Sequence, residues 1–116
     1  MMEVVDCTRA RRFLFACGQN RLRSPTAEQI FAKFEGLEVC SAGIKHEAEN
    51  PLTDELVQWA DTIFVMEQSQ RRKVQQRHRA AIGSTKIICL DIPDLFRLMQ
   101  PELVTTLESR MARHLG

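Results

Sequence analysis

The sequence contains no tyrosine, one tryptophan and no long hydrophobic run. A helix that spans a bilayer needs about 20 consecutive apolar residues, and no segment of this chain approaches that length. The apolar stretch 13–17, which follows a pair of arginines, is shorter than the roughly 7–15 residues of a signal-peptide core. We therefore expect a cytoplasmic protein that does not associate with a membrane.

Closely spaced cysteines are also missing. The four cysteines lie at positions 7, 17, 40 and 89, with no C-x2-C pair and no set of nearby histidines. Structural zinc sites usually show such pairs, and disulfide-rich scaffolds belong to secreted proteins. The pattern argues against both classes and indicates reduced thiols.

A strong excess of one charge is absent as well, because 16 Lys and Arg residues face 15 Asp and Glu residues. This balance argues against a protein whose main task is to coat nucleic acid or an anionic membrane. One basic run stands out, formed by Arg71, Arg72, Lys73, Arg77 and Arg79. It could bind a polyanion, but without interleaved aromatic residues a solvated helix face is the favoured interpretation, and we expect no nucleic-acid partner.

Hydrophobic and charged residues, at 44% and 27%, are those of a globular protein, and 116 residues suffice for one core. We expect a single domain over residues 1–116. Four short segments rich in apolar and β-prone residues predict strands, at 12–16, 37–41, 62–66 and 86–90. Three of them are nearly continuous apolar runs, as parallel strands covered on both faces are.

Helical patterns separate these strands. We expect one helix that begins at Ser24, whose hydroxyl caps it, and ends at Gly36, with Phe34 on its apolar face. We expect Asn50-Pro51 to open a second helix and Pro101 to open the last one. Segment 68–79 has a single apolar residue and predicts a largely solvated helix. Strands alternating with helices predict a small three-layer α/β sandwich with a parallel sheet.

The loop after the first predicted strand carries the chemistry. It begins at Cys17 and leads directly into the helix at Ser24, so its backbone N–H groups are expected to converge on one point, as in an anion-binding nest. The helix dipole and nearby arginines there stabilise a thiolate at Cys17. Arg23, six residues on, offers a planar fork of donors to two phosphate oxygens. The loop therefore predicts a nucleophile that faces a bound oxyanion.

Residues 13–28, with the pattern FLFAC-x-x-N-x-x-RSP-x-AE, resemble the N-terminal signature of low-molecular-weight protein tyrosine phosphatases and their arsenate reductase relatives. Segments 41–43 (SAG) and 60–66 (ADTIFVM) and the sequence Ile92-Pro93-Asp94 are similar to later parts of that family. The resemblance spans residues 12 to about 96. It implies a flavodoxin-like fold of the phosphotyrosine-phosphatase-I type, with strand order 2-1-3-4.

The resemblance also implies roles for individual residues. Cys17 would be the nucleophile that forms a phosphocysteine, Arg23 the phosphate clamp and Asp94 the general acid and base, with Asp91 as its competitor. Ser24 would donate to the thiolate, and Asn20 would hold the loop through contacts that include Ser41. The other implied phosphate- or substrate-binding residues are Gly18, Gln19, Arg21 and Leu22 in the loop, and Phe96 as a wall of the substrate crevice.

These roles amount to metal-independent hydrolysis of phosphate monoesters, with no cofactor. The substrate would be a phosphorylated protein or a small phosphate ester, and the protein a monomer or weak dimer. Two alternatives remain open at this stage: an arsenate reductase-like redox enzyme, and a non-catalytic module that binds phosphate or a phosphopeptide. The first needs additional thiols to resolve its intermediate, and Cys40 and Cys89 are expected on strands.

Overall fold

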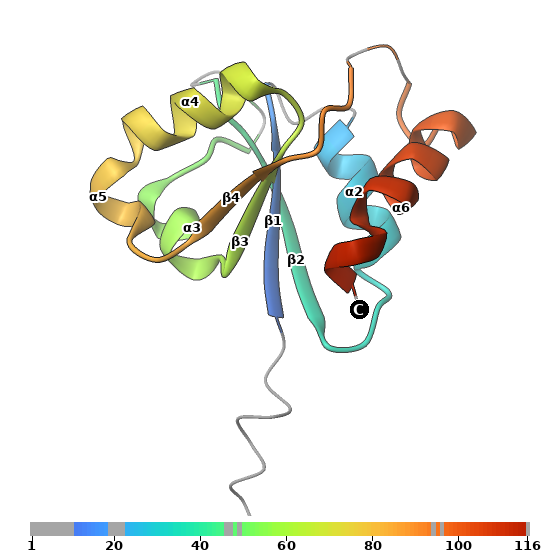
Figure 1. Cartoon of the computed structure of the whole chain (residues 1–116), viewed down its shortest axis with the longest axis horizontal. Helices are drawn as coiled ribbons and strands as arrows, with labels where there is room; N and C mark the ends of the chain where they lie inside the picture. The colour runs from blue at the N-terminus through green and yellow to red at the C-terminus, as the bar shows by residue number, and fades with distance from the viewer. Residues whose placement is uncertain are drawn as a thin grey trace, which may run out of the picture.

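The computed structural model describes residues 11–18, 23–45, 48, 50–93, 95 and 97–115 (Figure 1). Its centre is a parallel four-stranded sheet in the order β2-β1-β3-β4. The strands are β1 (Arg11–Cys17), β2 (Leu37–Gly43), β3 (Thr62–Val65) and β4 (Lys86–Cys89). The predicted strands, their parallel pairing and their order are confirmed.

The helices form two outer layers. α2 (Arg23–Phe31) and α6 (Pro101–Leu115) lie on one face of the sheet, while α3 (Asp54–Trp59), α4 (Gln68–Arg77) and α5 (Arg79–Ile82) lie on the other (Figure 1). Helices on both faces leave β1 and β3 without a wet side, which is why their sequences are almost continuously apolar. The three-layer α/β prediction is confirmed.

Each face of the sheet has its own hydrophobic core. On the α2 and α6 side, the ring of Phe15 is stacked with those of Phe31 and Phe64, at centroid distances of 5.7 and 5.4 Å. Three residues of α6, spaced four apart, close this core: Leu103, Leu107 and Met111. On the other side, Leu14, Ile63 and Val65 pack against Val57 and Val74. Odd-numbered residues of β1 thus contribute to one core and even-numbered residues to the other.

The predicted helix boundaries were less accurate than the strands. α2 ends at Phe31, a turn follows to Gly36 with φ of +81°, and Phe34 is 42% exposed instead of buried. A left-handed backbone suits glycine, so Gly36 still ends the connection, one turn after the helix has stopped. α3 begins only at Asp54, because Thr53 is its N-cap and accepts a hydrogen bond from the backbone N of Leu56.

The residues that precede α3 serve the sheet edge. Pro51 forms an isolated parallel bridge with Gly43, and Leu52 N donates to Gly43 O at 2.7 Å. Asn50-Pro51 therefore pairs with the end of β2 at the sheet edge and does not open the helix.

Segment 68–79 forms α4 and the start of α5, and only Gln70 and Val74 of α4 are buried. The prediction of a largely solvated helix is confirmed. None of the described helices is long and apolar enough to cross a bilayer.

Candidate functional site

Cys17 is the last residue of β1, and its side chain is buried at 4% exposure. Its Sγ lies 3.0 Å from Oγ of Ser24, which is itself fully buried in the first turn of α2. The strand and the helix that flank loop 18–22 thus meet at these two side chains. A hydroxyl at this distance can donate to a thiolate and stabilise its charge, which is the role that the family resemblance implies for Ser24.

Ser24 does not cap the helix as predicted, because α2 already includes Arg23. Ser24 is therefore the second helical residue. One residue step along the helix places the Arg23 and Ser24 side chains about 100° apart, so that they contact different partners. Ser24 turns to Cys17, and Arg23 turns to the ends of β3 and β4.

Arg23 is buried at 5% exposure and has a charged partner. Its Nη1 donates to a carboxylate oxygen of Glu67 at 2.6 Å and to the backbone oxygen of Ile92 at 2.8 Å. Glu67 is the second residue after β3, and Ile92 lies beyond β4. A buried guanidinium needs such partners, and the two bonds fix the direction of its planar fork.

This cluster lies at the position in the sheet topology where ligands of open α/β folds usually bind. The chain leaves β1 towards β2 on one side, and β3 lies on the other side of β1, so the connections diverge between β1 and β3. Ligands of open α/β sheets bind at the carboxyl ends of strands at such a switch point. Cys17 and Glu67 stand on its two sides.

The segment that follows β4 is fixed from two directions. Leu90 N donates to Val65 O and Ile92 N to Met66 O, which continues the pairing with the β3 side. From α6, Arg110 Nη1 donates to Leu90 O at 2.6 Å and to Asp91 O at 3.0 Å. Asp91 has φ of +54°, a left-handed conformation that is uncommon outside glycine and that helps the chain change direction here.

The carboxylate of Asp91 is directed back along the chain. Its Oδ1 accepts a hydrogen bond from Sγ of Cys89 at 3.4 Å, and Cys89 packs against the core on the α4 side. Arg23 and Cys17 are on the opposite side, in or beside the α2 and α6 core. Asp94 and Phe96, the other predicted residues of this segment, lie outside the described residues.

Loop residues Gln19, Asn20, Arg21 and Leu22 also lie outside the described residues, so the expected contact of Asn20 with Ser41 is not tested. The hydroxyl of Ser41 donates to Glu28 of α2, and its backbone oxygen accepts from the side chains of Asn50 and Cys40. Gly18 is described, and its oxygen accepts from Lys45 N at 2.9 Å. The loop after β2 is thereby tied to the start of the Cys17 loop.

The sequence reasoning missed Glu67 and Glu28. A signal for Glu67 was present: an acidic residue directly after a buried strand, at the edge of the sheet where the Cys17 loop was expected. Glu67 also starts α4 in a capping box with Gln70, so it connects the Arg23 guanidinium to the N-terminus of a helix. Nothing in the sequence indicated the pairing of Glu28 with Ser41.

The other described thiols differ from Cys17 in their surroundings. Burial, followed by the nearby Glu28 carboxylate, raises the pKa of Cys40 above its usual value. Burial is also the largest cause that raises the pKa of Cys89, and hydrogen bonding to the side chain of Asp91 adds to it. Both thiols are therefore weakly ionised at neutral pH and are poor nucleophiles. Among the described residues, no group of three or more His, Cys, Asp and Glu side chains is arranged to hold a metal ion.

No protein-family model matches the sequence, and a search of curated proteins found no match. Solved structures do match. Wzb from Vibrio vulnificus, in complex with benzylphosphonate, is 23% identical, with a TM-score of 0.72 over 90% of this chain and 97% of that chain. The tyrosine phosphatase Wzb from Escherichia coli K30, in complex with phosphate, is 20% identical, with a TM-score of 0.68 over 91% and 96% of the two chains.

A third similar structure is the YwlE arginine phosphatase from Geobacillus stearothermophilus, which is 21% identical, with a TM-score of 0.66 over 90% of this chain and 92% of that chain. At these identities the likeness shows the fold. The chain has the fold of the low-molecular-weight tyrosine phosphatases, as the resemblance of residues 13–28 implied.

Proposed function

We propose that this protein is a cysteine-dependent phosphatase that hydrolyses phosphate monoesters through a phosphocysteine on Cys17. The observation that carries the proposal is the cluster at the end of β1, where Cys17 Sγ lies 3.0 Å from Ser24 Oγ and Arg23 is held by Glu67. The neighbours in fold include a tyrosine phosphatase in complex with phosphate and an arginine phosphatase. In this proposal the chain is one catalytic domain, which acts in the cytoplasm as a monomer or weak dimer.

The first chemical step is attack of the Cys17 thiolate on phosphorus. The S–P bond forms as the bond from phosphorus to the leaving oxygen breaks, and Asp94 gives its proton to that oxygen. Arg23 and the amides of residues 18–22 would hold the remaining phosphate oxygens, whose charge grows in the transition state. Ser24 donates to Sγ and lowers the cost of the thiolate.

The second step releases phosphate. Asp94, now ionised, takes a proton from water as the water oxygen attacks phosphorus, and the S–P bond breaks to return the Cys17 thiolate. We assign this role to Asp94 and not to Asp91, because the Asp91 carboxylate accepts from Cys89 on the α4 side of the sheet. The balance of both steps requires no redox partner. The raised pKa values of Cys40 and Cys89 argue against the arsenate reductase alternative, which needs a reactive second thiol.

The substrate class is tested with a panel made of p-nitrophenyl phosphate, a phosphotyrosine peptide and a phosphoarginine peptide. We expect vanadate-sensitive release of phosphate that EDTA does not change, because the site uses a thiolate and an arginine. Comparison of kcat/KM across the panel identifies the leaving group. If the pure, folded protein binds phosphate but turns over no member of the panel, the non-catalytic binding module is the correct interpretation.

Glu67→Gln tests the anchor of Arg23. The amide keeps the size of the side chain but removes the negative charge that accepts from Arg23 Nη1 at 2.6 Å, so the guanidinium keeps its bond to Ile92 O but is held less firmly in direction. We expect kcat for p-nitrophenyl phosphate to fall about tenfold, since a charge-assisted hydrogen bond contributes roughly 1.5–3 kcal/mol. KM is expected to stay unchanged or to fall, because one negative charge beside the anion is gone.

Glu108→Gln is the matched control, since Glu108 lies on the exposed side of α6 and its removal should leave both constants unchanged. Equal losses in kcat for both variants, or a rise in KM without a change in kcat for Glu67→Gln, would show that Glu67 does not act by orienting Arg23.

A further inference from the structure

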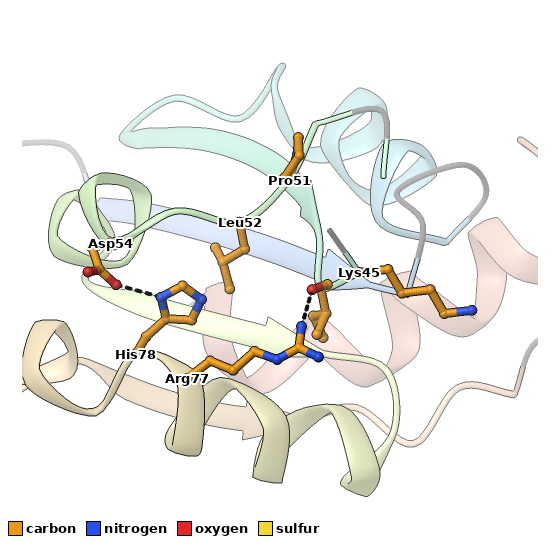
Figure 2. Close-up of a pocket in the computed structure, with 7 residues that line it drawn as sticks. Lys45, Pro51, Leu52, Asp54, Arg77 and His78 are labelled. Atoms are coloured by element: carbon orange, nitrogen blue, oxygen red, sulfur yellow. Dashed lines mark hydrogen bonds and ion pairs between the residues drawn. The ribbon is translucent and has the colours of Figure 1, made fainter. Parts of the chain in front are cut away.

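A groove of about 440 Å³ opens beside the Cys17 cluster, on the face of the sheet covered by α3 and α4. Its lining residues come from the segment after β2, the start of α3 and the end of α4: Ile44, Lys45, Pro51, Leu52, Asp54, Arg77 and His78. Figure 2 shows Lys45 at one end, the pair of Asp54 and His78 at the other, and Arg77 between them.

The described lining residues give the groove a net positive charge, because Lys45 and Arg77 outnumber the single carboxylate, that of Asp54. Asp54 is paired with His78, whose Nδ1 lies 2.6 Å from a carboxylate oxygen of Asp54. Arg77 donates to the backbone oxygen of Ile44 at 2.7 Å, which carries no formal charge, and Lys45 is exposed. Among the described residues, no carboxylate forms an ion pair with Arg77 or Lys45. The groove therefore favours an anionic group.

The positive charge continues along α4. Between Gln68 and Leu90 the sequence has no Asp or Glu, and it has six basic residues: Arg71, Arg72, Lys73, Arg77, Arg79 and Lys86. Such a segment stands out in a chain whose total charge is +1. The basic run that the sequence analysis treated as a solvated face thus borders a groove.

Helical geometry divides these charges between two sides of α4. Gln70 and Val74 are its buried residues and mark the side that faces the sheet. At 100° per residue, Lys73 and Arg77 lie one turn apart on one flank, and Arg77 reaches the groove. Arg71 lies on the opposite flank of α4, near Cys89 of β4. Burial is the largest cause that raises the pKa of Cys89, and the nearby charge of Arg71 lowers it.

One end of the groove lies at the start of the Cys17 loop, and α4, whose last residues line the groove, begins beside the partner of Arg23. Lys45 N is bonded to Gly18 O, one residue after the proposed nucleophile. α4 starts at Gln68, directly after Glu67, which holds Arg23. The bond between Lys45 and Gly18 places this end of the groove within reach of a polypeptide whose phosphate is bound at Cys17.

We propose that this groove, with Lys73 beside it, binds an acidic segment next to the phosphorylated residue of a protein substrate; the inference rests on the proposed phosphatase function. The floor of Ile44, Pro51 and Leu52 accepts the aliphatic part of a side chain or an extended backbone, while Arg77 and Lys45 meet carboxylates. Stacking of successive nucleic-acid bases relies on large aromatic rings, and among the described lining residues there is no Phe, Tyr or Trp. An acidic polypeptide is therefore the occupant that the chemistry favours.

Two phosphopeptides test the proposal: one carries three Glu residues beside the phosphorylated residue, and the other has Gln in their place. We expect the acidic peptide to be hydrolysed with a kcat/KM about fivefold higher at low ionic strength, mainly through KM, and the advantage to disappear at 0.5 M salt. In Lys73→Gln/Arg77→Gln the ratio of the two kcat/KM values should fall to near one. Arg71→Gln/Arg72→Gln is the matched control, because it removes the same charge from the other sides of α4, and it should keep most of the preference.

Equal loss of the preference in both double variants, or no preference in the wild type, would overturn the groove as the docking site. If no peptide is hydrolysed at all, the phosphatase proposal fails, and binding of the fluorescent, unphosphorylated acidic peptide then decides the inference by itself. Weaker binding to Lys73→Gln/Arg77→Gln than to the control supports it, whereas equal binding to the two overturns it. Tighter binding of a single-stranded DNA of the same charge also overturns it. Thermal unfolding confirms that both variants are folded.

Discussion

Cys17→Ser is expected to abolish turnover, with kcat/KM for p-nitrophenyl phosphate at least about 10⁴-fold lower than in the wild type. The serine hydroxyl stays protonated at neutral pH and is a far weaker nucleophile than a thiolate. The remaining Ser24 and Arg23 side chains cannot replace the attack of the thiolate on phosphorus. The change is nearly isosteric, and Ser24 Oγ, 3.0 Å from Sγ, remains a partner for the new hydroxyl. We therefore expect phosphate binding and thermal stability to change little, so that loss of chemistry is separated from loss of the site.

Cys40→Ser and Cys89→Ser are the matched controls, since burial raises the pKa of both thiols and neither lies at the end of β1. Both should keep wild-type turnover of p-nitrophenyl phosphate. Acid quenching of the wild type during turnover, followed by mass spectrometry, should find phosphate on Cys17. Residual activity of Cys17→Ser above one per cent of wild type would refute the phosphocysteine route.

Phe15→Ala is expected to lower the free energy of unfolding by about 3–5 kcal/mol. Phe15 is completely buried, and its ring is stacked with those of Phe31 on α2 and Phe64 on β3. Truncation would leave a cavity in the core that joins α2 to the sheet. Since domains of this size are stable by roughly 5–15 kcal/mol, the variant would lose a large part of its stability. Equilibrium unfolding in urea at constant pH measures the change.

Phe34→Ala provides the comparison. Phe34 is 42% exposed and contacts only the edge of this aromatic cluster, through Phe31 at a centroid distance of 5.4 Å. It should lose less than about 1 kcal/mol. Similar losses for the two variants would mean that the Phe15 stack is not the centre of the core.

The sequence predicted the strands well because each is a local signal. Segments such as 62–66 are apolar throughout and too short for helices, and their pairing in the order 2-1-3-4 followed from the resemblance of residues 13–28. The last helix was equally clear, since Leu103, Leu107 and Met111 recur at steps of four residues. The predicted helix ends were wrong where a tertiary contact determines the boundary. Pro51 pairs with Gly43 at the sheet edge, and no local sequence pattern predicts this contact between the two ends of a loop.

The candidate site was predictable only in its local part. Cys17 and Ser24 flank one loop, and their approach follows from a strand that leads directly into a helix. The partners of Arg23 did not follow, because Glu67 and Ile92 belong to the ends of other strands and meet the guanidinium only through the sheet. Glu67 could equally have been an ordinary helix cap, a role that it also fills.

The two bonds of Arg23 join residues 44 and 69 positions apart in the chain. Contacts of such long range form late in folding, because the intervening chain must first be ordered. During synthesis, Cys17 and Arg23 emerge early, but the bonds of Arg23 to Glu67 and Ile92 form only when the segments after β3 and β4 have joined the sheet. A partly made chain therefore contains the proposed nucleophile before Arg23 has its bonds to Glu67 and Ile92, and under the proposed mechanism full activity requires completion of the sheet.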